Sequence, residues 1–102
     1  MDFKALAENL GLEQDEYAEL VELFVETGKP QIIELRQAVR EQDGESIRKI
    51  AHSLKGASGN MGLMEISQEA RKIEEQSVSE NFKAVGYSIK KMEKLIETLS
   101  VN

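Results

Sequence analysis

Apolar residues recur along the whole chain at spacings of three and four, which is the period of an amphipathic helix. The first such stretch is short, and Gly11 is its predicted end. Its apolar positions are Phe3, Leu6, Ala7 and Leu10. A second stretch begins near Glu13, where acidic residues suit the positive end of a helix. Its apolar positions are Tyr17, Leu20, Val21 and Phe24.

The tripeptide Gly28-Lys29-Pro30 interrupts the second stretch. Pro30 has no backbone N–H to donate, and its ring disfavours helical geometry at Lys29. Beyond it the apolar face resumes at Ile32, Ile33, Leu35 and Val39. The sequence predicts either one long kinked helix or two nearly collinear helices, and it leaves both open.

Three further amphipathic stretches follow. The turn Gln42-Asp43-Gly44 offers Asp43 as an N-cap for the first of them, and Gly62 is its predicted end. The segment Ser77-Val78-Ser79-Glu80 has the pattern of a capping box before the last. The apolar positions of the three stretches are, in order, Ile47, Ile50, Ala51 and Leu54; Leu63, Ile66, Ala70 and Ile73; Phe82, Val85, Ile89, Met92, Ile96 and Leu99.

Together these stretches predict an all-α fold. Four substantial amphipathic helices with short connections favour an antiparallel four-helix bundle, here with a short additional N-terminal helix. A chain of 102 residues supports one hydrophobic core, and no linker or repeat divides it, so we expect a single domain over residues 1–102.

The only histidine, His52, lies on the predicted helix between Asp43 and Gly62. At about 100° per residue its side chain falls roughly 150° from the apolar stripe of that helix. We therefore expect His52 to face solvent rather than the core. Neutral imidazole is a good nucleophile near pH 7, because its ordinary pKa is about 6.5.

The residues around His52 are unusual for a helix surface. Gly56 and Gly59 follow it by one and two turns, although glycine costs roughly 1 kcal/mol relative to alanine inside a helix. Their absence of bulk is compatible with access for another protein, and also with fraying toward Gly62. Lys55 lies one turn after His52, and Arg48 and Lys49 lie one turn before it. These cations suit a bound phosphoryl group, although Arg48 and Lys49 also fit an ordinary solvated face.

The composition excludes several function classes. The net charge of −6 argues against nucleic-acid binding, which needs a basic face. The absence of cysteine excludes disulfides, thiolate zinc sites and thiol nucleophiles. A single histidine with Lys49 three residues before it cannot supply the paired Glu-x-x-His motifs of a di-metal bundle, so we expect no metal site. No signal peptide or long apolar run is visible, and we expect a cytoplasmic protein without membrane contact.

The segment from Ala51 to Gly62, AHSLKGASGNMG, resembles the signature of histidine-containing phosphotransfer (HPt) domains. That signature is His-x-x-Lys-Gly followed by small residues and a later glycine. Downstream, Ile66, Ala70 and the pair Ile73-Glu74 are similar to further positions of the family pattern. The close match covers about 24 residues, and the order of the helices extends the likeness over the rest.

The resemblance implies that His52 carries a phosphoryl group and that Lys55 steadies its oxygens. It also implies that Glu74 hydrogen-bonds the imidazole, although Glu74 could equally be a solvated neighbour of Lys72 or Arg71. The implied partners are response-regulator receiver domains, which supply an aspartate and Mg²⁺, and a sensor or hybrid histidine kinase. The protein itself would be a phosphoryl carrier without a cofactor, not an enzyme, and we expect a monomer.

Two other functions stay open from the sequence. The chain could be the phosphotransfer module of a chemotaxis-type histidine kinase, in which ATP is the phosphoryl source. It could also be a non-catalytic helical adapter in which His52 is incidental. The adapter hypothesis accounts for the helices but not for the motif around His52.

Overall fold

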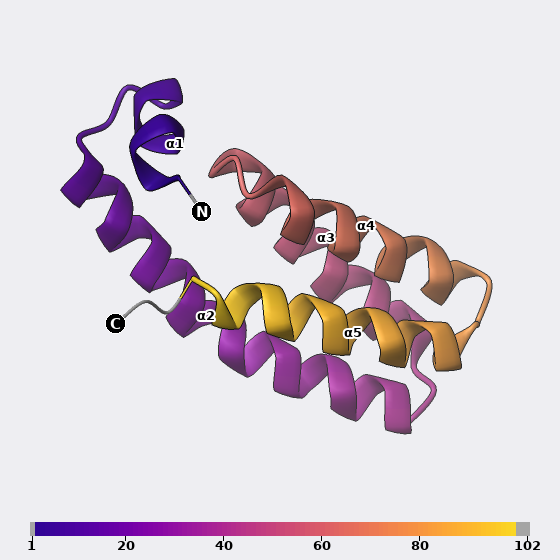
Figure 1. The fold of residues 1–102 in the computed structure, drawn as a ribbon. Coiled ribbons are helices and arrows are strands. Elements are labelled where there is room, and N and C mark those ends of the chain that lie inside the picture. Colours follow the sequence, from indigo (N-terminus) through magenta and orange to yellow (C-terminus); the bar gives the residue numbers. More distant parts are fainter. Residues whose placement is uncertain (1, 100–102) are drawn as a thin grey trace.

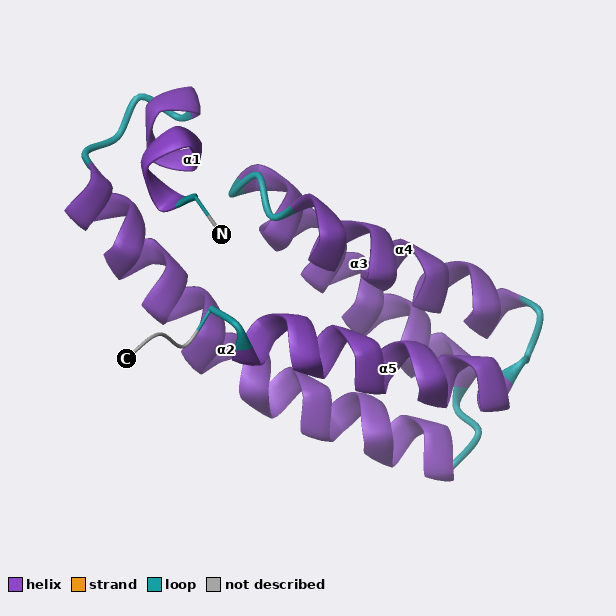
Figure 2. Cartoon of the chain, in the orientation of Figure 1, coloured by secondary structure: helices purple, strands orange, loops and turns teal. Residues whose placement is uncertain are grey.

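The computed structural model describes residues 2–99, and over that range it contains five helices and no strand (Figures 1 and 2). The helices are α1 (Phe3–Asn9), α2 (Gln14–Arg40), α3 (Gly44–Asn60), α4 (Met64–Val78) and α5 (Phe82–Glu97). The predicted all-α class is confirmed. The predicted domain range of 1–102 also includes Met1 and residues 100–102, which lie outside the described residues.

The ends of α1 and α3 form as their sequences predict. Gly11 and Gly62, which follow these helices, have φ values of 70° and 75°, a left-handed conformation that glycine adopts without strain. At the start of α3 the Asp43 carboxylate accepts a hydrogen bond from the backbone N–H of Ser46 at 3.1 Å. This cap satisfies one of the N–H groups that a helix start leaves without a partner.

The capping box predicted at Ser77–Glu80 is wrong. Helix α4 runs on to Val78, and the buried Ser77 hydroxyl donates to the carbonyl of Glu74 at 2.7 Å. Helix α5 instead begins after Asn81, whose side chain accepts from the backbone N–H of Ala84 at 3.2 Å. Ser77 faces the core, so its burial favours continuing α4 over ending it there.

Helix α2 is continuous through the Gly28-Lys29-Pro30 segment, so the single long helix is the correct alternative. Pro30 cannot donate to the carbonyl of Glu26, but both residues are exposed, and water can satisfy that carbonyl. Figure 1 shows α2 changing direction near its middle, as expected of a helix with an internal proline. The sequence does not decide this because exposure determines whether an unpaired carbonyl is tolerated.

The helices pack in chain order and close into a ring. Helix α2 contacts α3, α3 contacts α4 most extensively, α4 contacts α5, and α5 returns to α2, while α1 packs on α2 (Figure 1). At the end of the bundle that carries α1, the Tyr17 hydroxyl donates a hydrogen bond to the carbonyl of Met61 at 2.6 Å. The Tyr17 ring meets the Phe3 ring edge-on, with the ring centroids 5.6 Å apart. Burial raises the pKa of Tyr17, which keeps that hydroxyl protonated as a donor.

Three residues predicted on apolar stripes are exposed in the structure: Leu10 by 42%, Leu20 by 41% and Ile33 by 67%. Leu10 is the C-cap of α1 rather than part of its face. Leu20 borders the buried stripe of α2, whereas Ile33 points away from that stripe on the outer side of the helix. Among residues 2–99, no helix combines the length and apolar character needed to cross a membrane.

Candidate functional site

Helix α3 holds His52 outward by anchoring its opposite face in the core. Ile47, Ala51 and Leu54 are completely buried, whereas the His52 side chain is 65% exposed. The predicted exposure of His52 is therefore confirmed. Because these anchors bracket His52 on a single rigid helix, the imidazole has a fixed base and an open approach from solvent.

The carboxylate of Glu74, on α4, connects His52 with Lys55. One oxygen, Oε2, lies 2.9 Å from Nδ1 of His52, and the other, Oε1, accepts from Nζ of Lys55 at 2.7 Å. Residues 22 positions apart in sequence thus meet across the α3–α4 interface. The predicted contact between Glu74 and His52 is present, and the ion pair with Lys55 adds a partner that sequence reasoning did not find.

The electrostatics of Glu74 determine which imidazole nitrogen is free. The hydrogen bond from Lys55 lowers the pKa of Glu74, and the hydrogen bond from His52 lowers it further, against the opposing effect of burial. An ionised carboxylate only accepts hydrogen bonds, so Nδ1 of His52 must carry the proton. Nε2 then holds the lone pair of the neutral ring, on a side chain that is largely open to solvent.

A hydrogen bond outside the motif holds α4 against α3 near Lys55. The hydroxyl of Ser67 on α4 donates to the carbonyl of Lys55 at 3.1 Å. An extra Cβ on Gly59 would lie 3.4 Å from the same hydroxyl oxygen. Ser67 gave no signal in the sequence, because its role depends on which face of α4 meets α3.

Arg48 and Lys49 are not directed at His52 in this structure. Arg48 donates to Glu45 at 2.8 Å, and Lys49 lies 3.9 Å from the same carboxylate. The hydrogen bond with Glu45 raises the pKa of Arg48, and the charge of Glu74 adds a smaller effect in the same direction. Both cations therefore neutralise the first turn of α3, with Arg48 still within electrostatic reach of Glu74.

The two glycines beside His52 have different surroundings. A Cβ added to Gly56 would meet no atom within 4 Å, so the missing side chain leaves open space on the surface. Gly59 instead lies next to Ser67 on α4. Packing thus does not require glycine at position 56. Among the described residues, no group of three or more His, Cys, Asp or Glu side chains is arranged to hold a metal ion.

The sequence model of the Hpt domain family matches residues 19–101. The chain belongs to the Hpt domain family. A similar solved structure is the histidine-containing phosphotransfer protein B (HptB) from Pseudomonas aeruginosa PAO1, with a TM-score of 0.82 and 27% identity over 97% of this chain and 86% of that one. No curated protein matches the chain. The Hpt domain thus has a histidine phosphotransfer role in a two-component phosphorelay, in which Hpt domains work with receiver domains and histidine kinases.

Proposed function

We propose that His52 is the residue of this Hpt domain that accepts and returns the phosphoryl group, with the aspartyl phosphate of a receiver domain as its exchange partner. The observation that carries the proposal is the 2.9 Å contact between Nδ1 of His52 and the Glu74 carboxylate on an otherwise exposed ring. His52 is the only histidine in the sequence. It is also oriented by a second group, as a nucleophile requires.

In the proposed reaction the lone pair on Nε2 of His52 forms a bond to phosphorus. The bond from phosphorus to the partner's aspartate oxygen breaks, and its electrons remain on that carboxylate. The imidazole then carries a proton on Nδ1 and the phosphoryl group on Nε2, so the ring is positively charged. Glu74 faces that charge through Nδ1 and stabilises it, as an acidic residue stabilises an imidazolium in catalytic triads.

Lys55 has a second task in this proposal. Its ammonium group, which is 33% exposed at the side chain, pairs with Glu74 before transfer. Three N–H donors let it also contact a phosphoryl oxygen on the neighbouring His52. Gly56 leaves space for the partner, and Gly59 supports the packing of α4. Arg48 and Lys49 contribute only long-range positive charge, because Glu45 already pairs with both.

The remaining parts of the proposal concern the whole molecule. The ring of contacts among α2, α3, α4 and α5 supports an antiparallel four-helix bundle with α1 as a short additional helix. We also propose a single domain over 1–102, a monomer, and a cytoplasmic location. In this proposal transfer needs no cofactor on this chain, because the receiver domain supplies the Mg²⁺ that neutralises charge on the phosphoryl oxygens.

The test is incubation with a panel of phosphorylated receiver domains and Mg²⁺, followed by mass analysis and acid treatment. Wild-type chain should gain an acid-labile phosphoryl group, and His52→Gln should gain none while keeping its fold. If no receiver transfers but a histidine kinase core with ATP does, the chemotaxis-type module replaces the relay as its function. If neither donor modifies His52, the proposal fails and the helical adapter is left.

A further inference from the structure

The backbone of Lys55 accepts a hydrogen bond from a neighbouring helix. The Ser67 hydroxyl on α4 donates to the Lys55 carbonyl on α3 at 3.1 Å. The Ser58 hydroxyl lies 3.2 Å from the same oxygen, but it is closer to the carbonyl of Leu54, at 2.6 Å, within its own helix. Within residues 2–99, three side-chain hydrogen bonds join α3 to α4, and the other two end on the Glu74 carboxylate. The bond from Ser67 is therefore the one that fixes α4 to the backbone of α3.

The glycine at position 59 gives the Ser67 hydroxyl its place. The atom that a Cβ on Gly59 would meet within 4 Å is the hydroxyl oxygen of Ser67, at 3.4 Å. That distance is just below the separation of about 3.5 to 4.0 Å at which non-bonded atoms attract most strongly. A Cβ on Gly56, one turn earlier, would meet nothing within 4 Å. The missing side chain at Gly59 thus lets the Ser67 hydroxyl approach the α3 backbone.

Helix α4 holds Lys55 at two points. In a helix the carbonyl points toward the C-terminus, whereas the Cα–Cβ bond tilts toward the N-terminus. The Lys55 carbonyl accordingly reaches Ser67, and the Lys55 ammonium group reaches Glu74 at 2.7 Å. Ser67 and Glu74 are seven residues apart, so they lie two turns apart and within about 20° on one face of α4. Contacts at both ends of one lysine set the position of α4 along α3.

The Glu74 carboxylate needs that position because both of its oxygens are engaged. Oε1 accepts from Lys55 at 2.7 Å, and Oε2 lies 2.9 Å from Nδ1 of His52. Such bonds keep their strength only over a few tenths of an ångström and a narrow range of angles. Burial of Ile66 and Ile73 holds α4 in the bundle, but hydrophobic contacts have no preferred direction. A directional bond to the α3 backbone limits sliding of α4 where these side chains do not.

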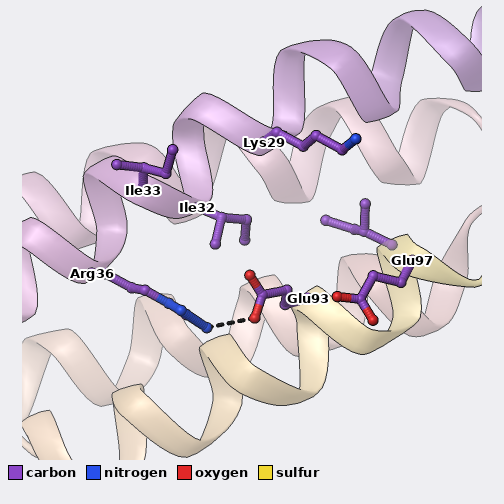
Figure 3. Close-up of a pocket in the computed structure, with 7 residues that line it drawn as sticks. Lys29, Ile32, Ile33, Arg36, Glu93 and Glu97 are labelled. Carbon is purple, nitrogen blue, oxygen red and sulfur yellow. Dashed lines mark hydrogen bonds and ion pairs between the residues drawn. The ribbon is translucent and has the colours of Figure 1, made fainter. Parts of the chain in front are cut away.

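The interface between α2 and α5 shows an ion pair without a bond of this kind. Arg36 on α2 and Glu93 on α5 lie 2.6 Å apart across a groove of about 490 Å³ (Figure 3). Within residues 2–99, this pair makes the one hydrogen bond between the two helices. Both side chains are 39% exposed, and long exposed side chains can follow small shifts of their helices. Glu74 is 18% exposed and binds two partners, so it lacks that freedom.

We infer that Ser67 is a positioning residue for the Lys55–Glu74 pair and, through Glu74, for the imidazole of His52. This inference rests on the proposed function of His52. The Ser67 hydroxyl bonds the backbone of α3 rather than the imidazole. It fixes α4 where the Glu74 carboxylate accepts from Nδ1 of His52 and leaves Nε2 as the nucleophile. Loss of the hydroxyl should therefore change the reactivity of His52 and leave the binding of a receiver domain unaltered.

The experiment compares Ser67→Ala with Ser77→Ala and with Ser67→Thr. Ser77 is the matched control, because its buried hydroxyl donates to the carbonyl of Glu74 within α4 and crosses no interface. Nitrogen NMR reports the tautomer of His52, phosphoramidate reports its reactivity without a partner, and transfer from a phosphorylated receiver domain gives kcat and KM. Ser67→Ala should show mixed tautomers and lose about three-fold to ten-fold in the phosphoramidate rate and in kcat, with KM unchanged. Ser77→Ala, and Ser67→Thr with its retained hydroxyl, should keep wild-type tautomers and rates.

The outcomes separate this inference from the function on which it rests. Wild-type tautomers and rates in folded Ser67→Ala would overturn the inference, and so would an equal loss in Ser77→Ala or no recovery in Ser67→Thr. If Ser67→Ala does not fold, Ser67→Cys replaces it, because a thiol nearly keeps the volume but is a weak donor, and the same results decide. If wild-type chain reacts with neither phosphoramidate nor any receiver domain, the proposed function fails, and the tautomers still decide the role of Ser67.

Discussion

The two faces of α3 meet opposite physical requirements within one helix. The inner face is completely buried at Ile47, Ala51 and Leu54, and it holds α3 in the core. The outer face exposes 65% of the His52 side chain and has open space at Gly56. The groups that stabilise the fold and those proposed for the chemistry are thus on separate sides of the helix. Stability and phosphotransfer should therefore respond to different substitutions.

The largest expected effect is on the outer face. His52→Gln should abolish phosphoryl acceptance, because no other imidazole is present in the chain. The melting temperature should stay close to that of wild type, because the His52 side chain is mostly in water. Phosphotransfer and thermal unfolding assays on the same sample check both parts. Unfolding of this variant would show that the two faces are not independent.

Gly56→Leu should lower the rate of phosphotransfer and raise the stability of the fold. The new side chain would fill the space beside His52 and block the approach of a receiver domain, so transfer should largely stop. Stability should rise by about 0.5 to 1 kcal/mol, since leucine favours a helix over glycine and a Cβ meets no atom within 4 Å. Urea unfolding measures the change in stability, and transfer kinetics measure the change in rate. An unchanged transfer rate would refute the access argument.

The inner face should show the reverse result. Leu54→Ala removes a completely buried side chain and should lower the free energy of unfolding by about 2 to 5 kcal/mol. Whatever fraction remains folded should accept phosphoryl groups at the wild-type rate, because Leu54 does not reach the exposed surface. The measurement is transfer activity per folded molecule below the melting temperature. A loss of activity in fully folded protein would show that the core face shapes the site directly.

Glu74 reaches the outer face of α3 from α4, and its substitutions should separate its roles. Glu74→Ala removes the acceptor at Nδ1 of His52 and should slow transfer about ten-fold, as expected for a lost charged hydrogen bond. Glu74→Gln keeps an acceptor and should retain most of the rate. Nitrogen NMR of the imidazole should show Nδ1–H in wild type and Glu74→Gln, and mixed tautomers in Glu74→Ala. Identical tautomers in all three would remove Glu74 from the mechanism.

The smallest expected effect is on the pH dependence of stability. The folded pKa of Glu74 lies below its ordinary value of 4.5, mainly because Lys55 donates to it. The Lys55–Glu74 pair therefore stabilises the fold above pH 4.5, and that stabilisation is lost as pH falls through the folded pKa. Both groups are partly exposed, so the contribution is at most about 1 kcal/mol. The stability difference between wild type and Glu74→Gln, measured by urea unfolding, should be present above pH 4.5 and shrink as pH falls through the lowered folded pKa of Glu74.

Local sequence patterns were sufficient to predict the helices, most of their ends, and the exposure of His52. These features depend on local periodicity, on glycine at left-handed positions such as Gly62, and on the Asp43 cap. They are local because each involves residues within one or two turns. The same reasoning failed at Ser77, where burial against the rest of the core outweighed a local capping pattern.

The contacts between separate helices, in contrast, depend on the packing of the whole chain. That packing brought Glu74 to His52 and Lys55 across the α3–α4 interface, paired Arg48 with Glu45, and left Leu20 exposed on a flank of α2. A helical wheel gives the direction of a side chain but not which neighbour lies in that direction. The physical reason is that packing angle and register arise from the whole core, so contacts between helices are not encoded in the spacing of residues within one helix.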